Sequence, residues 1–260
     1  MIKTVQSTTS HKFLVAGITA ITLAITAIAG PKQSANPSLS VQSGTPPSTP
    51  VDGMVWIEGA TFMMGSDSGS NDVRPRHEVA VSGFYMDKNE VTQEAYERAM
   101  GNNPSAFTNC PQCPVEQVSW QDAKNYCEKV NKRLPTEAEW EFACKAGSAA
   151  HYSWGDKVDG QYAWYFSNSE KKTHPVGQKQ PNKFGLYDMN GNVYEWCADR
   201  YDQTYYAKSP SQNPKGPQEG ESRVLRGGSW FNHWDGLRCA VRVWDDPGSS
   251  MHNIGFRCAR

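Results

Sequence analysis

GLYDMNGNVYEW, residues Gly185–Trp196, is the most informative stretch of this 260-residue chain. It concentrates oxygen donors around a single glycine, Gly191. Calcium takes six to eight oxygen ligands in a flexible geometry, and a glycine turn exposes backbone carbonyls well. The spacing is not that of an EF-hand, because the glycine falls between the second and third donors. Taken alone, the pattern fits either an Asx-type turn or a calcium site. The donors are Asp188, Asn190, Asn192 and Glu195.

Three further segments follow in the last third of the chain: RVLRGGSW (Arg223–Trp230), RCAVR (Arg238–Arg242) and GFRCAR (Gly255–Arg260). In this order and at this spacing, the four segments resemble the formylglycine-generating enzyme family, also called the sulfatase-modifying factor family. The resemblance implies a C-type-lectin-like α+β fold that is rich in loops and has little regular secondary structure.

The resemblance extends toward the N-terminus. SWQDAKNYCEKVNKRLPTEAEWEFACKAG (Ser119–Gly147) is similar to the central block of the family, and FYMDKNEVTQEAY (Phe84–Tyr96) also matches its pattern. In total the resemblance covers essentially residues 53–260. We therefore expect one domain over that range, and its roughly 200 residues suit a single hydrophobic core.

Local signals place helices and strands within this range. Thr92 can cap a short helix, and Ser119 with Asp122 makes an acidic variant of the capping box. Thr136 with Glu139 makes a full capping box for a helix that Gly147 ends. Loosely alternating residues predict short strand pairs over 54–65 and 78–88. Beyond residue 147 the sequence is rich in turns.

A structural calcium ion is what the resemblance implies for GLYDMNGNVYEW. The family's ligands carry over to Asp188 and Glu195 by side chain, and to Gly191 and Val193 by backbone carbonyl. A second calcium site known in the family would fall near residues 164–168, where WYFSN supplies few of the expected donors. We therefore expect one calcium ion.

The loop WFNHWDGLRCA, residues 230–240, is where catalysis would occur. Family members that are oxidases hold copper(I) between two cysteines here, since soft thiolates select that ion. The corresponding positions carry Asn232 and Trp234, and neither side chain can replace a thiolate. Ser229 and His233 are retained from the motif, and Cys239 matches a disulfide position. The chain thus resembles a divergent member that lacks the copper-binding pair, so copper is not expected.

Another metal could use the same loop. His233 and Asp235 supply two of the three ligands of a facial iron triad. A second histidine would have to come from His77, His151, His174 or His252, which follow no ligand spacing, so iron has no further support. The alternative is that His233 is a solvated or hydrogen-bonded loop residue. Catalytic residues stay unassigned. The candidate pocket comprises Ser229, Asn232, His233, Trp234 and Asp235.

Seven cysteines in an exported chain predict disulfides and one remaining thiol. The resemblance implies that Cys127 pairs with Cys258 and that Cys144 pairs with Cys239. Cys110 and Cys113 are close enough to pair with each other, and the alternative for them is a redox-active or metal-binding CxxC. Cys197 would then be the free thiol. We interpret it as a small buried hydrophobe rather than a nucleophile.

The N-terminal region predicts export. The uncharged apolar run Phe13–Gly30 ends with the small-x-small pattern of Ala27-Ile28-Ala29, so residues 1–30 are typical of a signal peptide. The alternative is an uncleaved membrane anchor, because 18 residues is near the lower limit for a bilayer span. Residues 31–52, rich in Pro, Ser and Thr, predict a disordered linker before the domain at 53–260. We expect a periplasmic or extracellular protein, attached to a membrane only if that segment is uncleaved.

The overall charge excludes one class of function. The formal net charge is -1, with 26 basic and 27 acidic residues. Nucleic-acid binding would need clustered excess Lys and Arg, so we expect none. The chain is also rich in aromatic residues, with 9 Trp, 11 Tyr and 9 Phe. They serve either as fillers of a loop-built core or as the lining of a cleft for peptide or glycan.

Three functional hypotheses follow from the sequence. The first is an exported family member that acts on protein or peptide substrates without the usual copper–cysteine chemistry. The second is a calcium-stabilised binding module for peptide or glycan that has no catalytic activity. The third is a true formylglycine-generating oxidase that converts a sulfatase cysteine to formylglycine. The sequence leaves open whether the chain is an enzyme; an enzyme would be an oxygen-dependent oxidoreductase that modifies a protein or peptide side chain.

Overall fold

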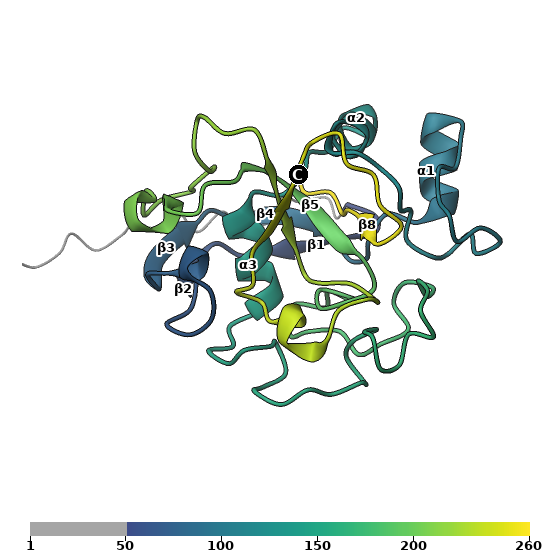
Figure 1. Cartoon of the computed structure of the whole chain (residues 1–260). Coiled ribbons are helices and arrows are strands. Elements are labelled where there is room, and N and C mark those ends of the chain that lie inside the picture. Colours follow the sequence, from purple (N-terminus) through teal and green to yellow (C-terminus); the bar gives the residue numbers. More distant parts are fainter. Residues whose placement is uncertain (1–50) are drawn as a thin grey trace, which may run out of the picture. The chain divides into compact units, whose positions relative to one another are not determined.

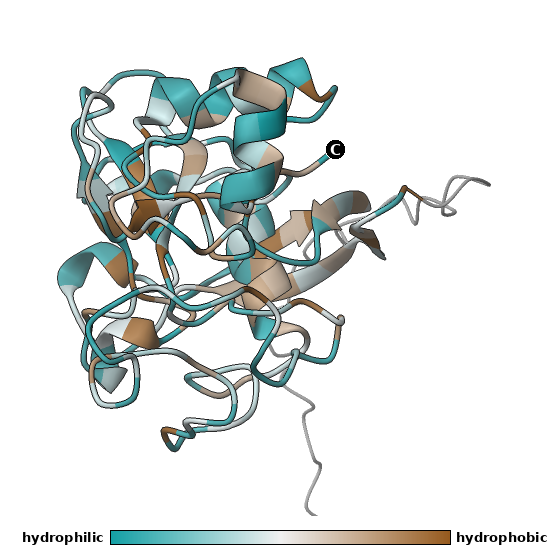
Figure 2. Ribbon diagram, turned by 90° about the vertical axis from the view of Figure 1, so that its right-hand side faces the viewer, coloured by the Kyte–Doolittle hydropathy of each residue, from teal (hydrophilic) through white to brown (hydrophobic). Residues whose placement is uncertain are grey.

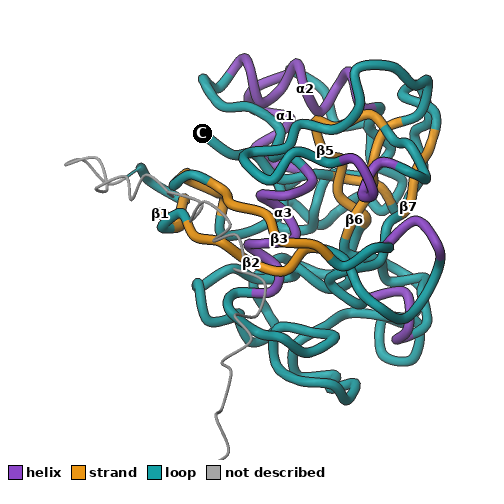
Figure 3. Tube along the Cα trace, turned by 90° about the vertical axis from the view of Figure 1, so that its left-hand side faces the viewer, coloured by secondary structure: helices purple, strands orange, loops and turns teal. Residues whose placement is uncertain are grey.

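The computed structural model describes residues 51–260, and this part of the chain is a mixed α+β fold in which loops predominate (Figure 1). The helices and strands are short, and much of the chain between α3 and β5 is irregular loop (Figure 3). The loop-rich α+β architecture expected from the resemblance is confirmed. The expected signal or anchor segment and most of the expected linker lie outside the described residues. Among residues 51–260, no helix is long and apolar enough to cross a bilayer.

A bent two-stranded ribbon forms the N-terminal part of the domain. Strand β2 pairs with β3 and β1 pairs with β4, both antiparallel. Gly59 and Gly83 form the corner between the two halves, where a Cβ on Gly59 would lie 2.6 Å from the Gly83 nitrogen. The strands predicted within 54–65 and 78–88 exist, but the two strands within each range do not pair with each other. The strands are β1 Met54–Ile57, β2 Ala60–Met64, β3 His77–Val81 and β4 Phe84–Asp87.

Three helices begin at the caps that the sequence predicts. The Thr92 side chain accepts a hydrogen bond from Ala95 N, and capping boxes form at Ser119 and Thr136. The third helix ends one residue earlier than expected, because Ala146 already takes a left-handed conformation (φ 45°) before Gly147. The helices are α1 Gln93–Met100, α2 Trp120–Lys129 and α3 Glu137–Lys145.

A four-stranded sheet in the order β7-β6-β5-β8 forms the second half of the domain. Strand β5 pairs antiparallel with β6 and parallel with β8. The sequence beyond residue 147 predicted turns and did not predict β5, because buried carboxylates interrupt the alternation of apolar and polar residues in this strand. Its Glu195 and Asp199 carboxylates are buried along with its apolar side chains. The strands are β5 Tyr194–Arg200, β6 Arg223–Arg226, β7 Val243–Asp245 and β8 Ile254–Gly255.

Helix α3 lies at the centre of the core. Its Trp140 is fully buried, and its Glu141 forms an ion pair of 2.5 Å with the buried Arg226 of β6. Glu137 pairs in the same way with Arg242 at 2.7 Å. Strands and inward helix faces carry the apolar residues, while the outer faces of the helices are hydrophilic (Figure 2). Because burial of an unpaired charge is costly, each ion pair holds α3 to the C-terminal segments strongly.

Three disulfides fasten the loops to this core, and they join the expected pairs. Cys127 on α2 bonds to Cys258, Cys144 on α3 bonds to Cys239, and Cys110 bonds to Cys113. The remaining cysteine, Cys197 on β5, is a buried free thiol.

The last segment of the chain closes the fold over the ribbon. Arg260 and Tyr85 exchange two backbone hydrogen bonds of 2.9 and 3.0 Å, and Asp87 N donates to Cys258 O, so residues 258–260 pair alongside β4. Ala259 exchanges a second pair of backbone bonds with Arg133, in the link between α2 and α3. The buried segment therefore connects the ribbon, the helices and the sheet.

Candidate functional site

The loop that follows β6 begins with two glycines at which any other residue would be strained. Gly227 and Gly228 have φ values of 91° and 74°, in the left-handed region. A Cβ on Gly228 would lie 2.6 Å from the Leu237 side chain, and one on Gly227 would lie 3.1 Å from the Trp140 ring. This tight approach turns the chain sharply at the end of β6 and presents Ser229 and the following residues above the core.

Asn232 holds this loop in place through hydrogen bonds of its side chain and backbone. Its Oδ1 accepts hydrogen bonds from the Ser229 hydroxyl at 2.6 Å and from the Ser229 N–H at 3.0 Å. Its Nδ2 donates to the Tyr194 hydroxyl at 2.7 Å, and its backbone carbonyl accepts from Phe166 N. Asn232, which the resemblance aligns with a copper-thiolate position, therefore forms hydrogen bonds to three other residues: Ser229, Tyr194 and Phe166. Burial raises the pKa of Tyr194, so this hydroxyl stays protonated at neutral pH.

The remaining residues of the candidate pocket point outward rather than converging. Trp234 is 52% exposed at the start of the short 3-10 helix η3 (Trp234–Leu237), and His233 and Asp235 are also exposed. The His233 ring lies against Phe166, with 4.7 Å between the ring centroids. Among residues 51–260, no three His, Cys, Asp or Glu side chains are placed to hold a metal ion. The described chain thus gathers no third ligand for an iron triad.

Three exposed aromatic side chains lie on the loop or beside it; we call them the aromatic face. It contains Phe166, Phe231 and Trp234, which are 42%, 59% and 52% exposed. Phe231 packs on the edge of the buried Trp230 at 5.5 Å. Half-exposed aromatic side chains favour contacts with ligands that are partly apolar and partly hydrated. The sequence showed that aromatic residues were numerous, but it could not tell which of them lie on the surface.

No pair of thiols exists near this loop. Cys239 and Cys144 are joined to each other, and the Asn190 amide lies 3.4 to 3.5 Å from both sulfurs. The only free thiol in residues 51–260 is Cys197, and no cysteine precedes them in the sequence. Burial, and next the Asp199 charge, raise the pKa of Cys197 well above its usual value. That thiol is therefore a protonated core group rather than a nucleophile.

The proposed calcium ligands lie together near the start of β5, and their suitability differs. Asp188 has a left-handed φ of 56°, and its Oδ2 accepts a hydrogen bond from Gly177 N at 2.7 Å. Its Oδ1 is buried and has no hydrogen-bond partner among residues 51–260. The carbonyls of Gly191 and Val193 accept no hydrogen bond from those residues either. These three groups have the donor chemistry that calcium uses.

Glu195 does not fit the same role. Arg257 donates to both of its oxygens at 2.8 Å, and Trp140 Nε1 donates to Oε2 at 2.8 Å. Because both oxygens are already engaged and the charge is balanced, Glu195 is better described as the partner of Arg257. In this respect the structure departs from the ligand set expected from the resemblance.

A third buried carboxylate, Glu90, belongs to the same cluster and was missed by the sequence reasoning. Its oxygens accept hydrogen bonds from Val193 N and from Asn192 Nδ2. Burial, and next the charges of Asp188 and Glu195, raise its pKa well above the ordinary value. Burial also raises the pKa of Asp188 to about 6. Glu90 lies some 100 residues before Asp188, so spacing could not reveal that they meet.

Comparison with known proteins places these observations in context. A family model described as "Sulfatase-modifying factor enzyme 1-like domain" matches residues 41–260. The serine/threonine-protein kinase pkn1 of Chlamydia caviae is 38% identical over 235 residues, which is 80% of this chain but 38% of that protein. The chain thus spans about two fifths of the length of that relative.

Two bovine proteins match over more of their length. The formylglycine-generating enzyme of Bos taurus is 30% identical over 298 residues, covering 87% of this chain and 79% of that protein. The "Inactive C-alpha-formylglycine-generating enzyme 2" of Bos taurus is 31% identical, covering 79% and 87% respectively.

Two solved structures have a similar fold. Treponema denticola variable protein 1 gives a TM-score of 0.73 at 34% identity, covering 79% of this chain and 94% of that one. PvdO from Pseudomonas aeruginosa gives a TM-score of 0.70 at 30% identity, covering 80% of this chain and 93% of that one.

Proposed function

The chain belongs to the family of sulfatase-modifying factor enzyme 1-like domains, and from this premise we propose that it is a non-catalytic member that binds peptide or protein ligands outside the cytoplasm. In this proposal the chain keeps the family fold and the exposed aromatic face. It lacks the copper–thiolate chemistry by which other members oxidise a cysteine.

The single observation that carries the proposal is the hydrogen bonding of Asn232. Every polar atom of its side chain is engaged by Ser229 or Tyr194, at distances of 2.6 to 3.0 Å. Copper(I) selects soft thiolate ligands, and an amide that is fully hydrogen-bonded offers it nothing. Trp234, at the second thiolate position, is exposed and cannot coordinate a metal. The bovine relative named as inactive indicates that other members lack the activity as well.

The aromatic face supports ligand binding at this place. Phe166, Phe231 and Trp234 present apolar rings to solvent, although apolar residues of that size are usually buried. Interfaces are enriched in Trp, Tyr and Phe, and a few such residues supply most of the binding energy. A peptide segment of mixed polarity suits this face.

A location outside the cytoplasm is supported by the cysteines. Three disulfides link positions 3, 95 and 131 residues apart. Such bonds persist in oxidising compartments and are rare where glutathione keeps thiols reduced. The apolar run at residues 13–30 is consistent with export.

We also propose one structural calcium ion at Asp188, held with the carbonyls of Gly191 and Val193, while Glu195 stays paired with Arg257 and Glu90 stays bonded to Val193 N and Asn192 Nδ2. When bound, the ion supplies positive charge and no redox chemistry. Asp188, Glu90 and Glu195 place three carboxylates near a single buried guanidinium, that of Arg257. A divalent cation would balance the remaining charge and engage the unpartnered Oδ1 of Asp188.

Two measurements test the proposal. The first incubates the disulfide-intact protein with copper(I), oxygen and a cysteine-containing sulfatase peptide, and uses mass spectrometry to look for an aldehyde. An active family enzyme is the positive control. We expect no conversion by this chain, and conversion would overturn the non-catalytic assignment.

The second measurement selects ligands from a peptide display library and compares two variants. Trp234→Ala should abolish selection, while Trp244→Ala should not, since Trp244 is equally exposed (54%) but lies on β7. Equal retention of peptides by Trp234→Ala and the wild-type protein would remove the aromatic face as the binding site.

A further inference from the structure

Strand β2 has an outer edge that no other strand covers. Thr61 faces Ala80 across the β2–β3 pair. Ala80 directs its own N–H and C=O away from β2, to Ser211 and Asn213. In an antiparallel pair, two residues that do not bond to each other both direct their backbone N–H and C=O groups away from the partner strand. Thr61 therefore presents these groups at the free edge of β2, and so does Met63, two residues further on.

Most of these edge groups have no partner. Within residues 51–260, nothing hydrogen-bonds to the N–H or C=O of Thr61 or to the N–H of Met63. The Met63 carbonyl accepts from Lys145 Nζ at 2.7 Å, which ends the free edge there. An exposed row of backbone donors and acceptors is a template for another strand.

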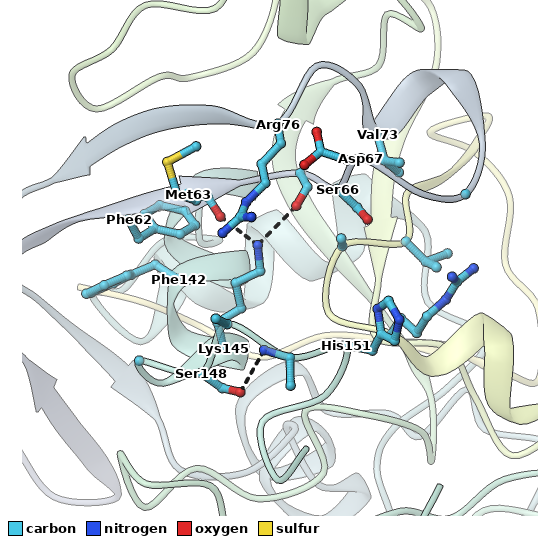
Figure 4. A pocket seen from close by; sticks show the side chains of 18 of the residues that line it. Phe62, Met63, Ser66, Asp67, Val73, Arg76, Phe142, Lys145, Ser148 and His151 are labelled. Atoms are coloured by element: carbon cyan, nitrogen blue, oxygen red, sulfur yellow. Dashed lines mark hydrogen bonds between the residues drawn. The ribbon is translucent and has the colours of Figure 1, made fainter. Parts of the chain in front are cut away.

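A groove of about 780 Å³ runs along this edge. One wall is β2 with the Gly65–Ser70 loop, and the other is the segment 147–151 that follows α3. Figure 4 shows Phe62 and Phe142 at one side of the groove, His151 at the other, and Lys145 reaching between them toward Met63. A groove of this volume suits a short segment of extended peptide.

The apolar end of the groove has an aromatic floor. The rings of Phe62 and Phe142 lie 5.2 Å apart, and those of Phe142 and Phe184 lie 5.7 Å apart. Phe62 and Phe184 are only partly buried, so their rings are open to a ligand. A bound strand points alternate side chains to one face, and apolar ones would rest on this floor.

Basic side chains also line the groove. Arg76 and Arg238 line the groove, and neither forms an ion pair within residues 51–260. Lys145 differs, because it is neutralised by Glu141 at 2.6 Å. Two acidic residues also line the groove: Asp67 in the loop after β2, and Glu58 in the turn before β2. Beside the Gly65–Ser70 loop, the two guanidinium groups therefore meet one carboxylate, that of Asp67. The excess of positive charge favours an acidic ligand group.

We propose that this groove binds an acidic peptide by strand addition: the peptide extends the β2–β3 ribbon along the free edge of β2, and its carboxylates reach Arg76 and Arg238. Backbone bonds to Thr61 and Met63 supply affinity, while the aromatic floor and the two guanidinium groups supply selectivity. The groove is separate from the aromatic face, so this inference goes beyond the proposed function and does not depend on it.

The test uses the full chain and a fluorescein-labelled hexapeptide of alternating valine and threonine that ends in two aspartates. A second probe carries N-methyl groups on its backbone amides, and a third replaces both aspartates by asparagine amides with an amidated C-terminus. We expect saturable binding of the first probe, about tenfold weaker binding of the third, and loss of binding by the second. Hydrogen exchange should show protection of the Thr61 and Met63 amides by the first probe and none by the second.

Variants identify the edge and the basic side chains. Thr61→Pro removes the outward N–H and should abolish binding, while Thr61→Val keeps it and should bind normally. Proline is tolerated where its missing N–H faces away from the ladder, and an unchanged melting temperature checks this. Arg76→Gln with Arg238→Gln should equalise the first and third probes. Trp234→Ala should leave all these values unchanged.

Three outcomes would overturn the inference. If the N-methylated probe bound as tightly as the first probe, the backbone amides would not be needed for binding. If decanoate displaced the first probe, the groove would be a pocket for small amphiphiles. Either outcome would exclude a strand-binding edge. Absence of protection at Thr61 and Met63 with saturating hexapeptide would exclude strand addition in the wild-type protein, whatever the variants do.

Discussion

The side-chain amide of Asn232 donates a hydrogen bond to the hydroxyl of Tyr194 across 2.7 Å, and thereby joins the loop after β6 to the first residue of β5. The same side chain accepts twice from Ser229. Asn232, for which the resemblance predicts a thiolate position, thus holds the loop in place.

Replacement of Asn232 by alanine should destabilise the protein by about 1–3 kcal/mol, because the buried Ser229 hydroxyl and N–H would lose their acceptor. Urea unfolding measures the loss. Asn125→Ala is the matched control, since Asn125 is exposed on α2 and accepts only from Gln121. An Asn232 variant as stable as that control would show that the loop does not depend on this residue.

Removal of calcium should lower the melting temperature of the wild-type protein and leave Asp188→Ala almost unaffected. The expected difference is about 2.7 kcal/mol when calcium is at 100 times its dissociation constant. Thermal unfolding in calcium and in chelator measures it. Equal destabilisation of Asp188→Ala under both conditions would contradict a calcium site at Asp188.

Free thiols should number one per chain. Cys197 is buried and the other six cysteines of the sequence are in disulfides, so a thiol reagent should label nothing in the native protein and one site in denaturant. Mass spectrometry without reduction identifies the labelled residue. Three labelled cysteines would reveal an open disulfide, and with it a thiol pair able to bind copper(I).

Asp199 should make the folded state less stable as pH rises. It is buried and accepts a hydrogen bond from Glu137 N at the start of α3. Burial, and next the Glu137 charge, raise its pKa well above 3.8. A raised folded pKa means that the native state binds the Asp199 proton more tightly than the unfolded chain does. The contribution of Asp199 to stability is therefore fully present below pH 3.8 and is lost as the pH rises through the folded pKa.

Asp199→Asn tests this dependence, because an amide keeps the acceptor and cannot ionise. Its stability relative to the wild-type protein should increase between pH 4 and pH 8, measured by urea unfolding at each pH. The comparison with wild type cancels the opposite contributions of paired carboxylates such as Glu141, whose pKa is lowered overall by Lys145 and Arg226 despite its burial. A constant difference across that range would mean that Asp199 is ionised in the fold.

The parts that could be read from the sequence are those set by local chemistry. The helix caps at Thr92, Ser119 and Thr136 lie within three residues of the groups they bond, so short-range pattern was enough. The fold class and the two long-range disulfides were predicted from the resemblance to the family. No local sequence pattern indicates which cysteines pair across 95 and 131 residues.

The elements of the fold and site that the sequence could not predict depend on partners far away in the chain. The sequence of β5 is not typical of a strand, since the buried Glu195 depends on Arg257, which lies 62 residues further along the chain. Glu90 joins the carboxylate cluster by tertiary contact alone. The pairing of β1 with β4 likewise follows from the corner at Gly59 and Gly83 rather than from proximity in the chain.

The closing segment has a consequence for biosynthesis. Cys258 bonds to Cys127, and Arg260 bonds to Tyr85 in the first ribbon of the domain. Neither contact can form until residues 258–260 have been synthesised. Cys127 and Tyr85 therefore stay without these partners while the preceding residues are made, and formation of the native Cys127–Cys258 disulfide follows synthesis of residue 258.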